Sequence, residues 1–280
     1  AKYHVLSNSL GGVSVEYMEE SDKKAWVRFR YPRWLYSSAA ICGIPIEVSR
    51  GFLHGWYAYN GISLNNPKLG FVCVSEDMTG QFGLCGYFKE FDHKLSLEDR
   101  LQFSADEIVP EFSSHSQPSL PDEFWGCERL IKAKRNYAID YYCNSLVALG
   151  EIIGFEKAEQ YGMRVGRLIG AQYYRDLAMK INVIDGGPKE AIIFIEKMMS
   201  GLGDLSVAKT ESQDYLTLRH VLPGFLRGLG AEAKRCLLNS WTEIWKGTII
   251  SHQTLMEVQC VENKNGEELE WNIKSKQKKK

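Results

Sequence analysis

Residues 155–182 read FEKAEQYGMRVGRLIGAQYYRDLAMKIN and predict a long helix. Apolar side chains recur at helical spacing along one side, at Tyr161, Val165, Leu168, Ile169 and Tyr173. Glycine recurs at every fourth position, which places Gly162, Gly166 and Gly170 on one stripe. Each glycine costs about 1 kcal/mol of helix stability relative to alanine, so three of them require a reason. Two reasons remain open: close approach of another helix at a domain or dimer interface, and a ligand lying over the stripe.

The rest of the second half mixes helices with antiparallel strands. Helical spacing recurs over residues 125–150, 188–199 and 223–247. Residues 215–220 predict a short strand. LMEVQCVENKNGEELEWNI, residues 255–273, predicts a hairpin around an Asn-Gly turn. This mixture predicts an α+β fold, with helices packed on antiparallel sheets.

The first half of the chain contains the same kinds of element. Alternating apolar residues at 13–17 and 25–31 predict a hairpin, and residues 69–91 predict a second hairpin around a glycine-containing turn. Residues 36–60 are rich in helix formers, although Pro45 must end one helix or begin another. This half is therefore expected to be α+β as well.

A segment rich in proline and serine separates the two halves. Residues 101–123 lose periodicity and are typical of a linker. We therefore expect an α+β domain at residues 1–100, a linker at 101–123, and a helix-rich α+β domain with a terminal hairpin at 124–280.

Both halves end with a helix followed by a hairpin. Residues 43–61 precede the hairpin at 69–91, just as residues 230–247 precede the last hairpin. Both helices carry small residues and paired aromatics near their C-terminal ends, and both hairpins place a Val and a Cys before a glycine turn. This predicts internal duplication of a helix-plus-hairpin unit. The alternative is that two amphipathic units with the same periods look alike.

The composition excludes several classes of protein. Of the 280 residues, 44% are hydrophobic and 25% are charged, which are the values of a folded globular chain. A net charge of -1 provides no overall field for nucleic acid, so no nucleic-acid partner is expected. Seven cysteines spread along the chain are unlike a disulfide framework and favour a reducing compartment. With no 18-residue apolar run and no signal-peptide pattern, we expect a cytoplasmic protein and no membrane partner.

The run LGEIIGFEKAEQYGMRVGRLIGAQYY, residues 149–174, resembles the helical opening of the bacteriochlorophyll 4-vinyl-reductase-type small-molecule-binding domains. The sensor domains of phenol-responsive activators share that fold, and the 2-amino-thiazoline-4-carboxylate hydrolase family has a similar opening. The resemblance extends over residues 124–273 and, more loosely, over 36–91. It implies helices against an antiparallel sheet and a buried apolar cavity for a small, often aromatic, ligand.

The phenol-sensing relatives bind a structural zinc in a cysteine-rich hairpin. Only Cys73 and Cys85 correspond to that hairpin here, with Glu76 and Asp77 between them. A zinc site normally takes four ligands, and no CxxC or HxxxH pattern is present. We therefore expect no metal and no cofactor, with zinc as the minor alternative. Three interpretations of the cysteines remain open: structural buried thiols, metal ligands, and catalytic nucleophiles.

His54 is the first candidate general base. It lies in GFLHGWYAYN, residues 51–60, where the density of aromatic residues predicts partial burial. Trp56 and Tyr57 are the candidates there for holding a substrate. His54 would activate a hairpin cysteine if the helix crossed the hairpin. The alternative is a hydrogen-bonded histidine in the core.

Two further groups of residues are candidates. His220 in LRHVLPG is a second candidate base, and Trp241 and Trp245 are candidates for substrate binding. The run KAKRNYAIDYY, residues 132–142, places an arginine and tyrosines on about two helical turns. The guanidinium could bind a carboxylate and the tyrosines a polar aromatic, in which case the binding residues are Arg135, Tyr137 and Tyr141. The alternative is an amphipathic helix whose tyrosines cap the core.

The sequence thus supports a pocket better than a reaction. The leading hypothesis is a cytoplasmic enzyme, a hydrolase or lyase, acting on a small organic acid or aromatic compound by acid-base chemistry in an apolar pocket. The alternative is a non-catalytic small-molecule sensor or carrier. In either case we expect a small-molecule partner and a homodimer. A third hypothesis is an interaction module that dimerises through the glycine stripe.

Overall fold

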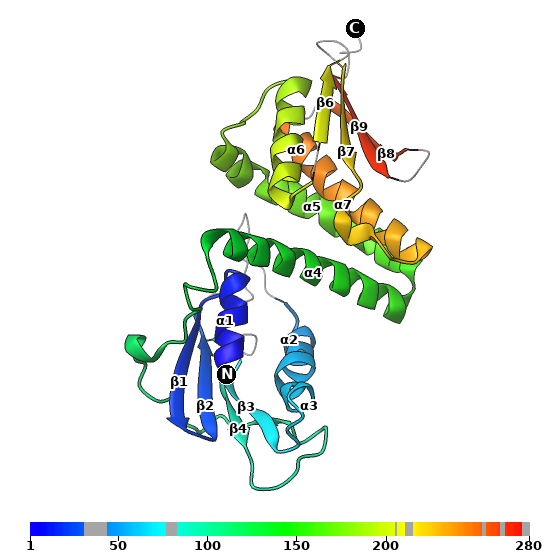
Figure 1. The fold of residues 1–280 in the computed structure, drawn as a ribbon. Coiled ribbons are helices and arrows are strands. Elements are labelled where there is room, and N and C mark those ends of the chain that lie inside the picture. The colour runs from blue at the N-terminus through cyan, green and yellow to red at the C-terminus, as the bar shows by residue number, and fades with distance from the viewer. Residues whose placement is uncertain are drawn as a thin grey trace. The chain divides into compact units, whose positions relative to one another are not determined.

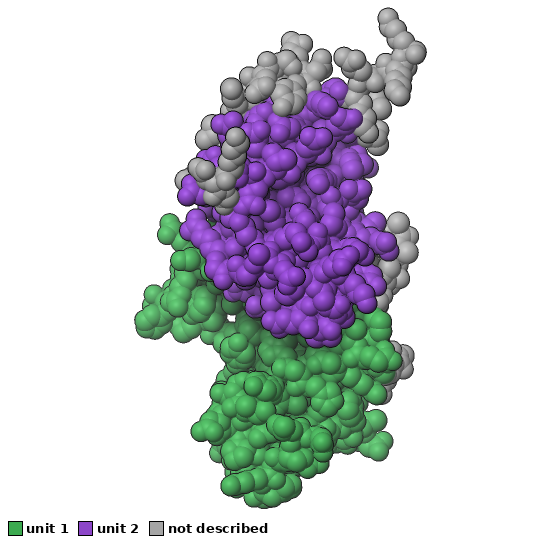
Figure 2. Space-filling model, turned by 90° about the vertical axis from the view of Figure 1, so that its right-hand side faces the viewer, with its two compact units in different colours: residues 1–137 green, residues 138–280 purple. Residues whose placement is uncertain are grey.

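The computed structural model describes residues 1–30, 44–76, 83–204, 206–210, 215–253, 256–263 and 267–275, with only the backbone at 206–210 and 215. The chain divides into two compact units, residues 1–137 and 138–280 (Figure 2). The division falls inside helix α4, Cys127–Ile153. The predicted linker contains strand β5, Leu101–Phe103, and a short 3-10 helix, Ser114–Ser116.

Unit 1 is a five-stranded sheet with helices packed on one face (Figure 1). In chain order its elements are α1 (Lys2–Leu10), β1 (Val15–Ser21), β2 (Lys24–Phe29), α2 (Ile46–Phe52), the π-helix η1 (Leu53–Ala58), α3 (Asn60–Ser63), β3 (Leu69–Ser75), β4 (Cys85–Glu90) and β5. The strand order is β1-β2-β4-β3-β5. All pairs are antiparallel except β3 with β5.

Residue alternation along these strands separates the apolar side chains onto two faces. On one face, Val27, Phe71 and Phe88 pack with Leu53 and Tyr57 of η1. The other face carries Met18, Trp26, Val72, Val74, Cys85 and Tyr87. Both predicted hairpins of the first half are confirmed, because β1 pairs with β2 and β3 pairs with β4.

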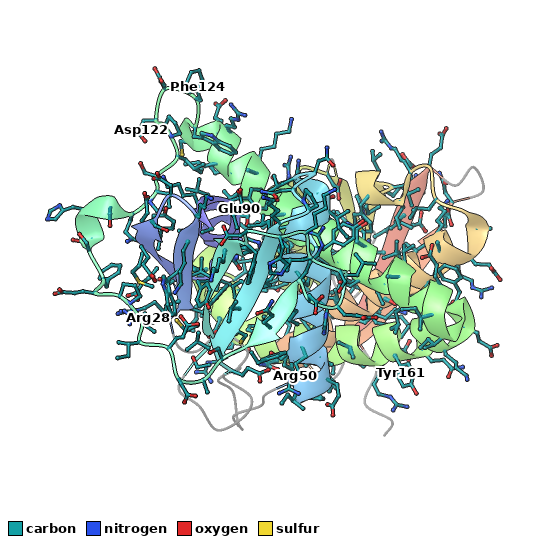
Figure 3. The ribbon with its side chains drawn as sticks, turned by 90° about the horizontal axis from the view of Figure 1, so that it is seen from below. Arg28, Arg50, Glu90, Asp122, Phe124 and Tyr161 are labelled. Atoms are coloured by element: carbon teal, nitrogen blue, oxygen red, sulfur yellow. The ribbon has the colours of Figure 1, made fainter. Side chains whose placement is uncertain are left out.

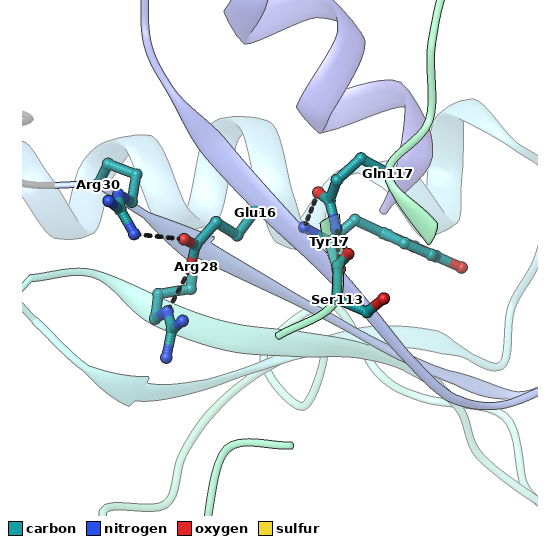
Figure 4. Close-up of polar contacts among 6 residues, drawn as sticks. All are labelled: Glu16, Tyr17, Arg28, Arg30, Ser113 and Gln117. Atoms are coloured by element: carbon teal, nitrogen blue, oxygen red, sulfur yellow. Dashed lines mark hydrogen bonds and ion pairs between the residues drawn. The ribbon is translucent and has the colours of Figure 1, made fainter. Parts of the chain in front are cut away.

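The segment expected to be a linker is fastened to β1. The Gln117 side chain donates to the Tyr17 carbonyl oxygen and accepts from the Tyr17 backbone nitrogen, at 2.8 Å each (Figure 4). On the same strand, the buried Glu16 carboxylate accepts hydrogen bonds from Arg28 and Arg30, at 2.6 Å each. Residue 117 is therefore hydrogen-bonded to the sheet of unit 1.

Unit 2 is a four-stranded antiparallel sheet with long helices. After α4 its elements are α5 (Phe155–Ile181), α6 (Pro188–Leu202), β6 (Ser206–Thr210), β7 (Tyr215–Val221), a 3-10 helix (Gly224–Leu226), α7 (Ala231–His252), β8 (Met256–Glu262) and β9 (Glu268–Ser275). The strand order is β6-β7-β9-β8. The predicted terminal hairpin is confirmed by the pairing of β8 with β9, although its Asn265-Gly266 turn lies outside the described residues.

The glycine stripe of α5 packs directly against α7. A Cβ at Gly170 would overlap the carbonyl oxygen of Ile244, and one at Gly162 would overlap the Ser240 hydroxyl. From the other side, a Cβ at Gly247 would overlap the carbonyl oxygen of Arg167. The prediction of close helix approach is confirmed, with a partner helix inside the same unit. A dimer contact or a ligand over this stripe is wrong, because α7 occupies the space.

The apolar side of α5 faces away from the core. Tyr161, Val165 and Leu168 are 55%, 51% and 64% exposed, and Figure 3 labels Tyr161 on this helix. The core of unit 2 instead takes the glycine side, together with the small Ala158 and Ala178 and the ring of Tyr174. The sequence pattern located the helix correctly, and the face that packs against α7 is the glycine stripe and not the row of larger apolar residues.

The two units repeat one arrangement of elements. Each runs helix, strand, strand, helix, strand, strand, and β1-β2-β4-β3 in unit 1 matches β6-β7-β9-β8 in unit 2. The helical segment from α2 to α3 takes the place of α7. The predicted α+β fold is confirmed, and the predicted helix-plus-hairpin unit recurs with the same strand order.

The glycine contact predicts a strong position dependence of alanine substitution. Gly170→Ala should lower the free energy of unfolding by about 1–3 kcal/mol, because the methyl group meets the backbone of α7. Gly201→Ala, in α6, meets no atom within 4 Å and should be neutral or stabilising by up to about 1 kcal/mol. Urea titration of both variants measures this difference. Equal stability of the two would contradict the described α5–α7 contact.

Candidate functional site

The buried imidazole of His220 lies at the centre of an aromatic cluster in unit 2. His220, on β7, is 2% exposed. Its ring centroid lies 5.6 Å from that of Trp241 on α7 and 6.3 Å from that of Trp271 on β9. Trp245 and Phe225 lie against Trp241, with centroid distances of 5.7 and 6.1 Å. We call these five residues the tryptophan cluster.

The hydrogen bonding of His220 defines its tautomer. The indole Nε1 of Trp271 donates to Nδ1 of His220 at 3.1 Å, so Nδ1 is the acceptor. The proton of the neutral ring is therefore on Nε2. Burial lowers the pKa of His220 to about 4, so the ring is neutral at pH 7. His220 is thus a hydrogen-bond donor through Nε2.

Two donors of the cluster are buried without acceptors. Nε2 of His220 and Nε1 of Trp245 have no hydrogen-bond partner among the described residues, and both atoms are closed to solvent. An unsatisfied buried donor costs about 1–3 kcal/mol. Both donors belong to rings that lie against Trp241, and an acceptor group beside either nitrogen would be stabilised.

Three predicted site residues, His220, Trp241 and Trp245, are brought together here. Trp271 was missed, although its place in the alternating run LEWNI is a visible signal for a strand residue on the core face. Only the tertiary structure shows that its indole is buried beside the imidazole of His220.

The tyrosine that reaches this core from α4 is Tyr142. Its hydroxyl donates to the carbonyl oxygen of Leu237 at 3.2 Å, and its ring lies 6.3 Å from that of Phe225. The predicted Tyr141 is one residue away, which is about 100° around the helix, and is 40% exposed. Tyr141 is therefore not a member of the tryptophan cluster, and its role in binding substrate stays a prediction.

The other two predicted residues of α4 belong to unit 1. The Tyr137 ring packs against Gly11 at the end of α1. Arg135 is half-buried, and its Nε makes no hydrogen bond among the described residues. Neither residue is a member of the tryptophan cluster.

His54 is exposed, so the predicted burial of its imidazole is wrong. The reason is local, because residues 53–58 form a π-helix, whose wider turn changes which side chains face the sheet. Tyr57 is fully buried in this turn and Trp56 is half-buried. Both pack around His4, a 1% exposed imidazole of α1 that the sequence analysis missed.

Cys73 and Cys85 face opposite sides of the unit 1 sheet. Cys73 is opposite Gly86 in the register, so the neighbouring Cys85 must point the other way. Cys73 belongs to the core under the helices and Cys85 to the outer core. A shared zinc is therefore excluded for this pair. Asp77 lies outside the described residues, and within the described ones no group of three metal-ligating side chains is found.

Each unit also contains a cavity at its surface. In unit 1 a cavity of about 370 Å³ borders His4, Trp56, Asn60 and Phe88. In unit 2 a cavity of about 380 Å³ lies along α7 between Lys234, Lys246 and Glu262, where Lys234 is paired with Glu262 at 2.6 Å. No helix in the described part of the chain is long and apolar enough to cross a membrane.

Comparisons with known proteins found no family model and no curated protein that matches the chain. Solved structures of H-NOX proteins are similar at low scores. One, described for its heme redox potential and porphyrin distortion, has 14% identity and a TM-score of 0.30, and covers 61% of this chain and 82% of its own. Another, a mutant H-NOX of T. Tengcongensis, has 15% identity and a TM-score of 0.28, and covers 63% and 83%. Likeness at this level assigns neither fold nor function.

The prediction of no cofactor is contradicted by these heme-associated neighbours and is given up. His220 nevertheless does not fit a heme iron, which needs an axial ligand beside an open space. Nε2 of His220 carries a proton, and Nε2 of His4 is 2.7 Å from the amide nitrogen of Asn60. His220 borders neither cavity, whereas His4 borders the cavity of unit 1. We assign no residue of this chain to heme.

The lowered pKa of His220 predicts a loss of stability in acid. The unfolded imidazole has a pKa of 6.5 and the folded one about 4, so the unfolded state binds more protons between these values. The free energy of unfolding should therefore fall as the pH drops from 6.5 to 4, by about 3 kcal/mol from this residue. Denaturation of His220→Gln across this range should show a correspondingly shallower dependence. A dependence equal to that of the parent protein would refute the assignment.

Burial also predicts which thiols react. Burial raises the pKa of Cys85 to about 11 and that of Cys260 to about 12, which suppresses the reactive thiolate. Cys127 is exposed. Iodoacetamide at pH 8 should therefore label Cys127 well before Cys73 or Cys85, as followed by peptide mass spectrometry, with the denatured protein as the control. Rapid native labelling of Cys73 or Cys85 would restore the nucleophile hypothesis.

Proposed function

We propose that this protein is a small-molecule sensor or carrier, and that unit 2 binds an aromatic molecule with an acceptor oxygen in the tryptophan cluster. The observation that carries the proposal is the pair of buried donors, Nε2 of His220 and Nε1 of Trp245, which lack acceptors among the described residues. An acceptor oxygen placed beside either nitrogen would satisfy that donor. The surrounding indole and phenyl rings provide the apolar contacts that an aromatic ring needs.

The electrostatics favour a neutral ligand. His220 is uncharged at pH 7, and a carboxylate buried beside it would lose its hydration without gaining a counter-charge. A phenolic or aromatic carbonyl oxygen accepts a hydrogen bond from such a buried donor at a lower desolvation cost. The chemical class is therefore a small aromatic alcohol, ketone or aldehyde.

The state of His220 supports binding rather than catalysis. A general base needs an available lone pair, and the lone pair of Nδ1 is used by Trp271. Because the pKa of the ring is about 4, the imidazole is neutral at pH 7 and carries its one proton on Nε2. Nε2 is therefore a hydrogen-bond donor and not a base. The hydrolase or lyase chemistry remains a sequence prediction. Because both donor atoms are closed to solvent, entry of a ligand requires rings of the cluster to rotate.

Acetophenone, which accepts hydrogen bonds but does not donate them, tests this site by ligand-observed NMR titration. Trp245→Phe keeps an aromatic ring and removes one donor, so affinity should fall about threefold to tenfold. Trp125→Phe, which alters a half-buried tryptophan of unit 1, is the matched control and should bind as the parent does. Toluene should bind more weakly than acetophenone to the parent protein.

Two outcomes would count against the proposal. One is a complete absence of acetophenone binding, and the other is equal affinity in Trp245→Phe and the parent. Recovery of unaltered acetophenone and phenyl acetate after long incubation would agree with a sensor or carrier. Hydrolysis of phenyl acetate that depends on His220 would instead favour the enzyme hypothesis.

A further inference from the structure

The cavity of unit 1 has the dimensions and lining of a ligand site. Its volume of about 370 Å³ falls in the range of about 300–1,000 Å³ that small-molecule sites occupy. Its walls come from α1, from η1 and α3 with the residues that adjoin them, and from strands β3 and β4. Most of the lining is apolar or aromatic, and includes Trp56, Leu64 and Phe88. His4 and Asn60 are among its few polar groups.

The imidazole of His4 forms a rigid part of the wall. It is stacked on Tyr57 and on Phe88, with centroid distances of 4.5 and 4.9 Å, and lies 5.3 Å from Trp56. Three aromatic neighbours hold the ring in one orientation. The cavity is thus bounded by side chains that are packed before any ligand arrives.

The orientation of the Asn60 amide follows from its neighbours. Nδ2 lies 2.6 Å from the carbonyl oxygen of Trp56 and 3.1 Å from that of Tyr57, so this end of the amide must be the nitrogen. The same nitrogen is 2.7 Å from Nε2 of His4. All its hydrogens are used within the protein. The amide oxygen makes no hydrogen bond in the described part of unit 1 and is the group left to accept one from a ligand.

The backbone around Asn60 provides an independent observation. Trp56 and Tyr57 lie in the π-helix η1, a rare element that is frequently found at functional sites. Asn60 bonds two carbonyl oxygens of this wide turn, so the unusual turn and the amide orientation depend on each other. In the repeated arrangement of elements, this segment takes the place of α7, which carries Trp241 and Trp245.

We infer that unit 1 carries a second small-molecule site, for a planar aromatic or heteroaromatic ring that bears an N–H or O–H donor, with Asn60 as its acceptor. The hydrogen-bond polarity is opposite to that of the tryptophan cluster, where the protein donates. A donor-only ring such as indole therefore belongs to unit 1, and an acceptor-only ring such as acetophenone to unit 2.

Indole titration of the full chain by ligand-observed NMR tests this site. Leu64 lines the cavity but is 67% exposed, so Leu64→Trp fills the space without disturbing the core, and saturable indole binding should be lost. Leu97→Trp adds the same bulk at a 69% exposed position of unit 1 that does not line this cavity, and should bind indole as the parent does. 1-Methylindole, which lacks the donor, should bind about threefold to tenfold more weakly than indole.

The proposed sites of unit 1 and unit 2 can be refuted independently of each other. Leu64→Trp should leave acetophenone binding unchanged, and Trp245→Phe should leave indole binding unchanged. The unit 1 site would be overturned if Leu64→Trp still bound indole, or if indole and 1-methylindole bound with equal affinity. This conclusion would hold whether or not acetophenone binds to unit 2. Circular dichroism and thermal unfolding of both leucine variants confirm that a lost titration reflects the cavity and not the fold.

Discussion

The backbone contact between α5 and α7 is the constraint on which unit 2 depends. Glycines on both helices remove the side chains that would separate them, and Gly170 lies directly against the Ile244 carbonyl oxygen. Three glycines in one helix cost helix stability, which the packing must offset. The same contact sets the position of α7 relative to the rest of the core. Trp241 on α7 then meets the sheet at His220 and Trp271, and Trp245 lies against Trp241.

Polarity distinguishes the two proposed sites, which share one arrangement of elements. In unit 2, Trp271 fixes His220 as a donor, and Trp245 adds a second donor nearby. In unit 1, the amide nitrogen of Asn60 is hydrogen-bonded to two backbone carbonyl oxygens and lies against His4. The amide oxygen of Asn60 is therefore the acceptor that the protein offers. A duplicated unit that keeps its sheet order while reversing this polarity can bind two kinds of aromatic molecule. That account requires no catalytic residue in either unit.

The periodicity of apolar residues and the residues at turns predicted much of the fold. The direction in which individual side chains point could often be known only from the tertiary structure. The hairpins followed from alternation, and the close approach of α5 to another helix followed from glycines at every fourth residue. His54 was misjudged because a π-helix changes the face of its segment. Cys73 and Cys85 look adjacent in the hairpin but differ in strand parity. Tyr142, and not the neighbouring Tyr141, reaches the core of unit 2, since successive helical positions point about 100° apart.

The proposed site in unit 2 depends on the buried donors of His220 and Trp245 binding an acceptor oxygen of the ligand. Its most direct test is the ¹H–¹⁵N spectrum of the tryptophan indoles during acetophenone addition, with the Trp245 signal identified by its absence in Trp245→Phe. The account predicts a downfield shift of the Trp245 Nε1 proton and the appearance of a slowly exchanging His220 Nε2 proton. A Trp245 signal that does not move while acetophenone binds would contradict it.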